Sequence, residues 1–379
     1  MKKRFLFSAF AACGLSLSAF ATPAQVQNNF KQAINEVDAG GEYICYGDLT
    51  YTHDIFTKKF PSIIRKVAKN TQYASLINQA TNSVLKLINF KAFKAVAYSS
   101  IEQAPGVFVT KAFLLADMHR NSILIDNTAV NSTLDLGALP ADTRIAFKGH
   151  LNLARAWSMI YKEMKFNPNP QIRNLAKELD REINNSGIDV HAVMASINGE
   201  VEILLAGTGP QDVSAKVVIP DANGSITEQL KKILNNRTMI PLGTNTGIFV
   251  NIVYSNGKIT AVTNRKLLRR PMHSLASRED FRVYAAQLPK QVSEYLIVDI
   301  PQELIDLGRA MAEQEGGEKV GKAFDHLQPI SVIAVGETKA NGIKSVAVSN
   351  FSFYQLPMQL LVKGAEIASE FADFADFAE

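Results

Sequence analysis

A serine and a lysine placed one helical turn apart are the first residues of this sequence that could do chemistry. Ser83-Val-Leu-Lys86 has the spacing at which a lysine amine activates a serine nucleophile. Ser255-Asn256-Gly257 and Lys319-Val320-Gly321 follow it in the order that penicillin-recognising hydrolases use. However, the second triplet is explained by a hairpin turn, and the third lacks a threonine and lies in a predicted helix. We therefore predict no catalytic residue, and an unrecognised hydrolase stays as the second alternative for function.

The six histidines include no pair at the i, i+4 spacing that puts two metal ligands on one face of a helix. Met118-His119 and Met272-His273 occupy matching positions, and the two pairs could bind a soft metal if they met. Inheritance of a packing methionine and an exposed histidine by two copies of a repeat explains the same pattern. No glycine-rich loop has the frame that cradles a phosphate. The sequence therefore predicts no metal and no cofactor.

Two surface features could contact a partner. One is a basic cluster, which is typical of a solvated loop or of a surface for an anion, a lipid headgroup or an acidic partner. The other is a C-terminal stripe of phenylalanines that recur every three residues beside aspartates, which predicts an amphipathic helix over residues 357–379. That helix could dock on its own domain, fray, or bind a partner. The candidate contact residues are Arg265, Lys266, Arg269, Arg270, Phe371, Phe374 and Phe377.

The elements that must position these residues repeat four times along the chain. Each unit is a predicted strand, a helical stretch and a hairpin, and Asn198-Gly199, Asn256-Gly257 and Asn341-Gly342 mark three of the turns. Ser225, followed three residues later by Glu228, predicts a capped helix start in the third unit. The hairpins are predicted at 94–115, 191–206, 248–263 and 330–351, and the preceding strands at 42–48, 143–148, 214–219 and 294–299. The helices are predicted at about 54–70, 74–89, 151–165, 170–185, 225–235, 302–314 and 317–326.

Two longer connections group the four units into two pairs. Leu139-Pro140 and Leu288-Pro289 close the connections, and the Met-His pairs stand at corresponding places within them. We therefore predict an α+β protein of two duplicated domains, each a largely antiparallel sheet built from two strand–helix–hairpin units with helices on one face. The predicted boundaries are 1–21 for a signal peptide, 22–40 for an N-terminal helix, 41–211 and 212–356 for the domains, and 357–379 for the C-terminal helix.

The N-terminus predicts export. A basic Met1-Lys-Lys-Arg4, a short apolar run and Ala19-Phe-Ala21 are typical of a secretory signal peptide cleaved after Ala21, and a retained anchor is the alternative. Removal of this segment lowers the formal net charge from +4 to +1, so no strong field would attract nucleic acid. No later apolar run is long enough to span a membrane. Only Cys45 would remain, so we expect no internal disulfide and a small core residue in a buried strand, with a reactive thiol or an intermolecular bridge as the alternative.

Leu139-Pro-Ala-Asp-Thr143, which opens a strand–helix unit, resembles a phrase that begins the tandem α+β repeats of a family of uncharacterised exported bacterial proteins. The layout covers most of the mature chain, whereas the motif covers only those residues. The second copy departs from it, because Lys290-Gln291-Val292 follows Leu288-Pro289. The resemblance implies a location in the cell envelope and no known catalytic residues.

These observations predict a soluble, exported protein, in the periplasm of a Gram-negative bacterium, with a non-catalytic binding or scaffolding role. Its binding surface would be the seam between the domains or the open faces of the sheets. The alternative is a carrier of lipid or another apolar ligand, which predicts a concave apolar sheet face with the helices folded over it. The expected partner is an unknown protein or a small apolar ligand, and not nucleic acid.

Overall fold

The computed structural model describes residues 23–353, except for 51–52, 54, 69–73, 129, 168, 210–211, 243–246, 318–320, 322–323 and 325–326. The predicted signal peptide, the predicted C-terminal helix with Phe371, Phe374 and Phe377, and Lys319 of the third hydrolase motif lie outside the described residues. Within them the chain is a mixed α/β protein with one large antiparallel sheet, which confirms the coarse prediction of the fold class.

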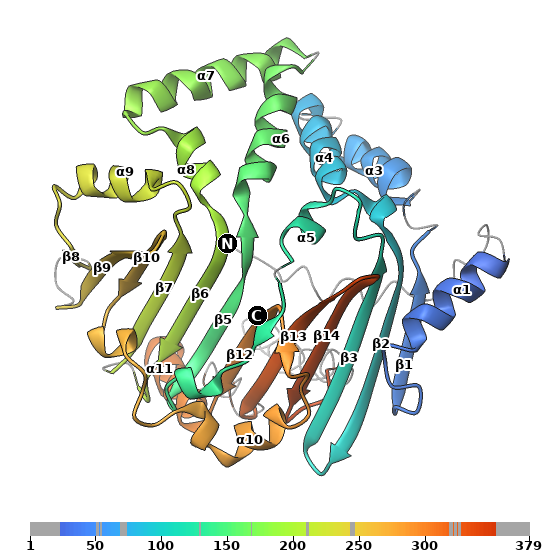
Figure 1. Cartoon of the computed structure of the whole chain (residues 1–379), viewed down its shortest axis with the longest axis vertical. Helices are drawn as coiled ribbons and strands as arrows, with labels where there is room; N and C mark the ends of the chain where they lie inside the picture. Colours follow the sequence, from blue (N-terminus) through green and yellow to red (C-terminus); the bar gives the residue numbers. More distant parts are fainter. Residues whose placement is uncertain are drawn as a thin grey trace, which may run out of the picture.

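A single sheet of twelve strands runs across the described part of the molecule (Figure 1). Its spatial order is β1-β2-β3-β14-β13-β12-β5-β6-β7-β10-β9-β8, and every neighbouring pair is antiparallel. A two-stranded ladder of β4 and β11 accompanies it. The strands are β1 (Tyr43–Asp48), β2 (Phe93–Ala104), β3 (Val107–Ala116), β4 (Ser132–Thr133), β5 (Thr143–Asn152), β6 (Asn198–Ala206), β7 (Ser214–Pro220), β8 (Met239–Pro241), β9 (Phe249–Ser255), β10 (Lys258–Val262), β11 (Gln291–Val292), β12 (Glu294–Ile300), β13 (Ile330–Lys339) and β14 (Gly342–Ser349).

The two predicted domains share this sheet and alternate along it. Strands β1, β2 and β3 of the first half are followed by β14, β13 and β12 of the second. Then come β5 and β6 of the first half, and finally β7, β10, β9 and β8 of the second. The predicted boundary at 211/212 falls between β6 and β7, which pair with each other. The duplication into two domains is therefore not confirmed, and the described residues do not form a separate sheet for each domain.

Three of the four predicted hairpins are present, and one is wrong. In the β9–β10 turn, Asn256 and Gly257 both have positive φ, at 51° and 67°, as the predicted type I′ turn requires. The β2–β3 and β13–β14 hairpins also form at the expected places. The strand predicted at the start of 191–206 is instead helix α8 (Val190–Ser196), because the Asp189 side chain caps it by accepting from the Ala192 amide. Asn198 and Gly199 then belong to β6 rather than to a turn.

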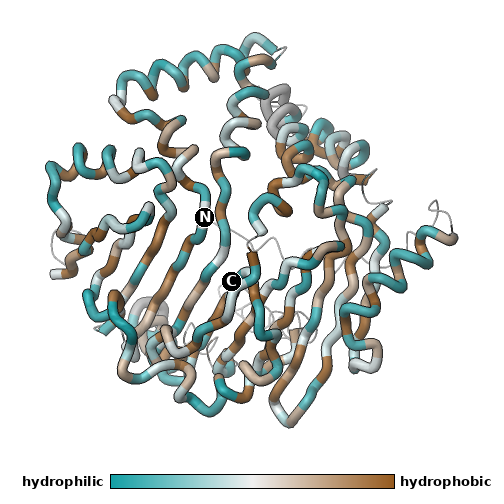
Figure 2. Tube along the Cα trace, viewed as in Figure 1, coloured by the Kyte–Doolittle hydropathy of each residue, from teal (hydrophilic) through white to brown (hydrophobic). Residues whose placement is uncertain are grey.

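Most of the helices lie beyond one end of the strands rather than on a sheet face (Figure 1). The helix α7 is mostly hydrophilic, whereas the strands carry most of the hydrophobic residues (Figure 2). None of the helices in the described residues combines the length and the apolar character that a membrane span needs. The helices are α1 (Pro23–Ile34), α3 (Phe60–Ala68), α4 (Ala74–Ile88), α5 (Ile123–Asp126), α6 (Leu153–Lys165), α7 (Pro170–Ser186), α8, α9 (Ser225–Ile233), α10 (Glu279–Ala285) and α11 (Gln302–Gly316), with the shorter turns η1 (Ile55–Lys59), η2 (Phe90–Ala92), η3 (Leu136–Ala138), η4 (Arg265–Leu268) and η5 (Leu275–Ser277).

The start of α9 is capped from a position that differs from the prediction. Its N-cap is Gly224, with a positive φ of 79° and no side-chain hydrogen bond, so Ser225 is already helical. The carboxylate of Asp221 accepts from the amides of Ile226 and Thr227, at 3.0 and 2.9 Å. It therefore satisfies first-turn donors that a capping serine would otherwise accept from.

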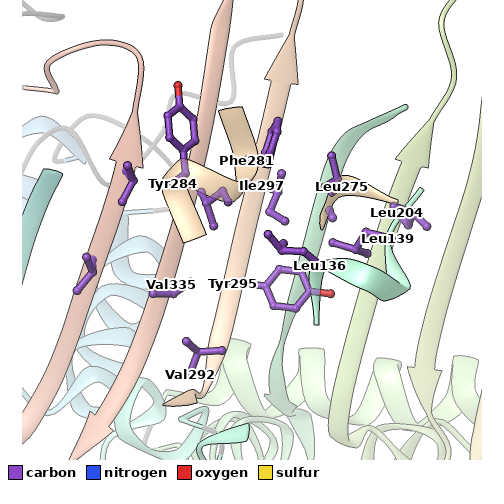
Figure 3. Close-up of a cluster of buried hydrophobic side chains, with 14 of the residues drawn as sticks. Leu136, Leu139, Leu204, Leu275, Phe281, Tyr284, Val292, Tyr295, Ile297 and Val335 are labelled. Carbon is purple, nitrogen blue, oxygen red and sulfur yellow. The ribbon is translucent and has the colours of Figure 1, made fainter. Parts of the chain in front are cut away.

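The two predicted connections meet on the sheet and form its main core. We call residues 117–142 the first connector and residues 263–293 the second connector. The amide of Leu275 donates to the carbonyl of Leu139 at 2.9 Å, and β4 pairs with β11. Both leucines are almost fully buried, and they pack with Ile297 of β12 in the largest apolar cluster (Figure 3). The matching Leu-Pro positions therefore do mark segments that lie together, although not as ends of two separate domains.

A buried carboxylate joins the second connector to three strands. Asp299 on β12 is 1% exposed, and its Oδ2 accepts from Arg144 of β5 at 2.8 Å and from Arg278 at 2.6 Å. Its Oδ1 accepts from the Ser331 hydroxyl of β13 at 2.7 Å. Arg278 also pairs with Asp280 at 2.6 Å, so the network holds two positive and two negative groups. Burial opposes the charge on Arg278, yet its hydrogen bonds to Asp299 and Asp280 raise its pKa overall, which keeps the guanidinium charged.

We expect Asp299→Asn to lower the free energy of unfolding by about 3–5 kcal/mol, because two arginines would face each other without the shared negative charge. Urea denaturation monitored by circular dichroism measures this loss. The control is Asp306→Asn on α11, where the carboxylate accepts from the exposed Gln302 amide at 2.9 Å and from no other group of the described residues. Equal losses in the two variants would contradict a special role for Asp299.

Candidate functional site

The serine–lysine motifs do not assemble into a nucleophile site in the described residues. Ser83 and Lys86 both lie on α4, beside a cavity of about 370 Å³ between α4 and α6. The Lys86 amine donates to Glu163 of α6 at 2.8 Å, so it takes part in an ion pair between the two helices. Ser255-Asn256-Gly257 forms the β9–β10 turn, as the hairpin interpretation predicted.

The Met-His pairs occupy different environments. Met118 packs with Phe93 and Ile125 in a small apolar cluster, whereas the side chain of Met272 is 97% exposed. Within the described residues, the histidine, cysteine, aspartate and glutamate side chains form no cluster of three that could hold a metal ion. Cys45 is a free, half-buried thiol on β1.

The basic cluster contacts its own chain at two of its four positions. Arg265 Nε donates to the Asn251 side chain of β9 at 2.9 Å, and the Arg270 guanidinium lies 3.5 Å from Asp135 of the first connector. Lys266 and Arg269 are exposed beside them. The cluster thus lies along η4 and fastens the second connector to the sheet and to the first connector.

The two faces of the sheet are distinguished by the helices that pack on them. Phe281 and Tyr284 of α10 pack with Ile297, Ile333 and their neighbours on adjacent strands, and α1 packs on β1, β2 and β3. Strand register places both helices on the same side, because Val109 and Phe113 of β3 belong to that side together. We call this side the α10 face and the other side the apolar face.

On the α10 face, the strands β5, β6, β7 and β10 carry paired charges. Lys148 pairs with Glu200 at 2.9 Å, Lys216 with Glu202 at 2.7 Å, and Lys258 with Glu200 at 3.2 Å. These side chains are partly exposed. An antiparallel sheet with one solvated, charged face normally packs its opposite face against other parts of a protein. The composition of the apolar face therefore indicates what these strands bind.

The apolar face carries a continuous row of hydrophobic side chains across adjacent strands. The register places Leu296 of β12 beside Phe147 of β5, and Phe147 beside Ile203 of β6. Leu296 and Ile203 are 41% and 42% exposed, and Ile145 in the next row is 39% exposed. Exposed large apolar side chains that gather in this way mark binding surfaces. The full row from β14 to β9 is Ala347, Ala334, Leu296, Phe147, Ile203, Val217, Ala261 and Ile252.

One carboxyl group interrupts this face. Glu294 lies on β12 two residues before Leu296, opposite Gly336 of β13. Burial raises the pKa of its carboxyl above the ordinary value. Among the described residues Glu294 has no ion pair. The remaining carboxylates on β6, β12 and β13 each have one, and they are Glu200, Glu202, Asp299 and Glu337. An unpaired carboxyl in an apolar setting costs folding free energy, so it is a candidate for recognition.

Two glycines shape the surface around Glu294. A Cβ on Gly336 would lie 2.5 Å from Glu294 Cγ, so only glycine lets this side chain lie across β13. A Cβ on Gly149 would lie 2.7 Å from Phe147 Cζ, so the aromatic ring lies along β5 over this glycine. Continuing the β12–β5 register by one residue places Gly149 opposite Glu294. The carboxyl therefore extends over β13 and the ring lies along β5, on the two sides of β12.

The sequence indicated the apolar character of this face but not its polar group. Ile145, Phe147 and Gly149 alternate with Arg144, Ala146 and Lys148, which is the pattern of a strand with two unlike faces. Glu294 was visible only as the first residue of a predicted strand. Its isolation depends on the neighbours that β5 and β13 supply, and these strands lie far from it in sequence.

A second cluster of titratable groups joins α6, α7 and α8. Trp157 Nε1 donates to His191 Nδ1 at 2.9 Å, and the Tyr161 hydroxyl donates to Asp180 at 2.6 Å. The hydrogen bond to Asp180 raises the pKa of Tyr161. His191 Nε2 lies 4.0 Å from the same carboxylate. Because an indole can only donate, His191 Nδ1 is the acceptor of the hydrogen bond from Trp157.

Loss of this hydrogen bond should change the fluorescence of Trp157, which is the only tryptophan of the chain. His191→Phe removes the acceptor of the indole hydrogen bond, so we expect a shift in the emission maximum. His119→Gln, which is far from the indole in sequence and leaves the acceptor in place, should keep the emission of the unmodified chain. The same spectrum in both variants would contradict the contact.

Glu294→Gln should stabilise the protein at about pH 7 and have no effect near pH 4, close to the ordinary glutamate pKa of about 4.3. Because burial raises the pKa of Glu294 in the folded state, its charge costs stability once the pH exceeds that value, and the cost disappears when both states are protonated. Thermal unfolding at the two pH values measures the difference. Glu337→Gln, which removes an ion pair with Lys339 at 3.0 Å on the α10 face, should give no such stabilisation. A lower melting temperature for Glu294→Gln at neutral pH would contradict this account.

Comparison with known proteins identified no family model, no curated protein and no solved structure that matches this chain.

Proposed function

We propose that this chain is an exported, non-catalytic binding protein, acting in the periplasm, whose apolar face holds an apolar partner. The observation that supports the proposal is the row through Leu296, Phe147 and Ile203, where large hydrophobic side chains remain about two-fifths exposed in the middle of a wide sheet. Burying such side chains gives roughly 25 cal/mol for each Å² removed from water, so a partner that covers the row is favoured.

A small apolar ligand fits this surface better than a second folded protein does. The exposed strip is narrow, since Ile145, Ile203 and Leu296 are its exposed large residues on β5, β6 and β12. A stable protein interface commonly covers about 800 Å² on each partner. The carrier of lipid or another apolar ligand is therefore the form of binding that we favour, and a scaffolding role is the alternative.

We infer in addition that the chain arose by internal duplication. Two strand–helix–hairpin units support this inference: β1, β2 and β3 are adjacent in that order, and β12, β13 and β14 are adjacent in the same order. The two units meet where β3 pairs with β14 in an antiparallel manner, as two copies related by a twofold axis would.

Native mass spectrometry of protein purified from its host tests the carrier function. We expect an extra mass, released by organic solvent, that corresponds to an apolar small molecule. The double variant Ile203→Ser, Leu296→Ser should lose that mass, because it removes the exposed centre of the row. The control is Ile233→Ser on α9, where the side chain is 59% exposed but lies away from the sheet.

A native mass that contains only a second protein as partner, or a mass of the protein without any ligand under all conditions, would argue against the carrier function. Retention of the ligand by the double variant would mean that another surface binds it. Circular dichroism of each variant establishes that the fold is kept.

A further inference from the structure

Glu294 is the only charged residue that strand register places on the apolar face of β13, β12, β5, β6, β7 and β10. We propose that this face binds an amphiphile made of an alkyl chain and a protonated amine, with the amine paired to Glu294 and the chain lying along the row from Leu296 to Ala261. The inference rests on the proposed function and adds to it the chemistry of the ligand.

The position of Glu294 suits a headgroup at the side of a chain-binding row. Its carboxyl extends across β13 above Gly336. The hydrophobic row crosses β12 at Leu296 and β5 at Phe147, which are two residues from Glu294 and from Gly149, the residue opposite it. From β12 to β10 the row crosses four strand spacings of about 4.8 Å, roughly 19 Å in total. A long extended alkyl chain can follow that span with its charged end near Glu294.

The charge selects the headgroup. A carboxylate in apolar surroundings interacts strongly with an opposite charge, because little water screens the pair. An amine supplies both that charge and the hydrogen-bond donors which Glu294 lacks among the described residues. A carboxylate or phosphate headgroup without an amine would be repelled at the same place.

The carboxylates on the α10 face do not offer an equal site. Glu200 already binds Lys148 and Lys258, and Glu202 binds Lys216. An added amine would have to displace a lysine that the fold holds close by, which gains little. Amine binding is therefore expected on one side of the sheet only.

Three probes with the same alkyl chain test the proposal on the full chain: dodecylamine, dodecanol and dodecanoate, each below its micelle concentration. Isothermal titration should give the tightest binding for dodecylamine, weaker binding for dodecanol and the weakest for dodecanoate. Glu294→Gln should weaken dodecylamine by about tenfold or more and leave dodecanol unchanged. Glu337→Gln is the matched control, because it neutralises a carboxylate of the neighbouring strand on the other face.

The results distinguish failure of the amine inference from failure of the proposed carrier function. Equal binding of the three probes, or tightest binding of dodecanoate, would overturn the amine inference and leave the apolar carrier standing. Failure of all three probes, together with an unliganded native mass, would overturn both. If Glu294→Gln did not fold, the order of the three probes with the unmodified chain would still decide the inference, and Glu294→Asp would provide the second variant.

Discussion

The buried carboxylate of Asp299 is the interaction on which the arrangement of the sheet depends. It binds Arg144 from the first half of the chain and Arg278 from the second connector, and it lies on the strand that joins them. Each arginine would be costly to bury alone, and the shared carboxylate makes both acceptable. β5 is thereby held beside β12, and α10 is held over the centre of the sheet. The apolar cluster around Leu275 and Ile297 then packs between α10 and strands whose relative positions are fixed.

The same pairing of β5 with β12 produces the candidate site. Phe147 and Leu296 become neighbours only because these two strands, separated by about 150 residues in sequence, lie side by side. Glu294 becomes isolated for the same reason, since β5 and β13 present glycines and apolar residues beside it. A row that looks like ordinary strand alternation in each segment becomes a continuous surface when the segments are brought together.

Local features of the fold were predictable, and the pairing of distant strands was not. The positive φ of Asn256 and Gly257 follows from their residue types, so that hairpin was correctly predicted. His191-Ala-Val-Met-Ala195 was predicted as a strand from its apolar residues, but a short apolar run does not distinguish strand from helix, and the Asp189 cap decides it. The matching Leu-Pro positions indicated related segments. Their meeting through Leu139 and Leu275 depends on tertiary contacts that no local pattern contains.

The alternation of the two halves along the sheet affects how the sheet can fold while the chain is being synthesised. When only the first half is available, β3 and β5 each have an edge with unpaired backbone groups, and their partners β14 and β12 come some 150 to 230 residues later. Closing such long loops is slow, so the exposed edges must persist while the rest of the chain arrives. A chain that is synthesised from its N-terminus passes through this stage each time it is made. Protection of those edges from aggregation is then a requirement of its biogenesis, set by topology rather than by any single residue.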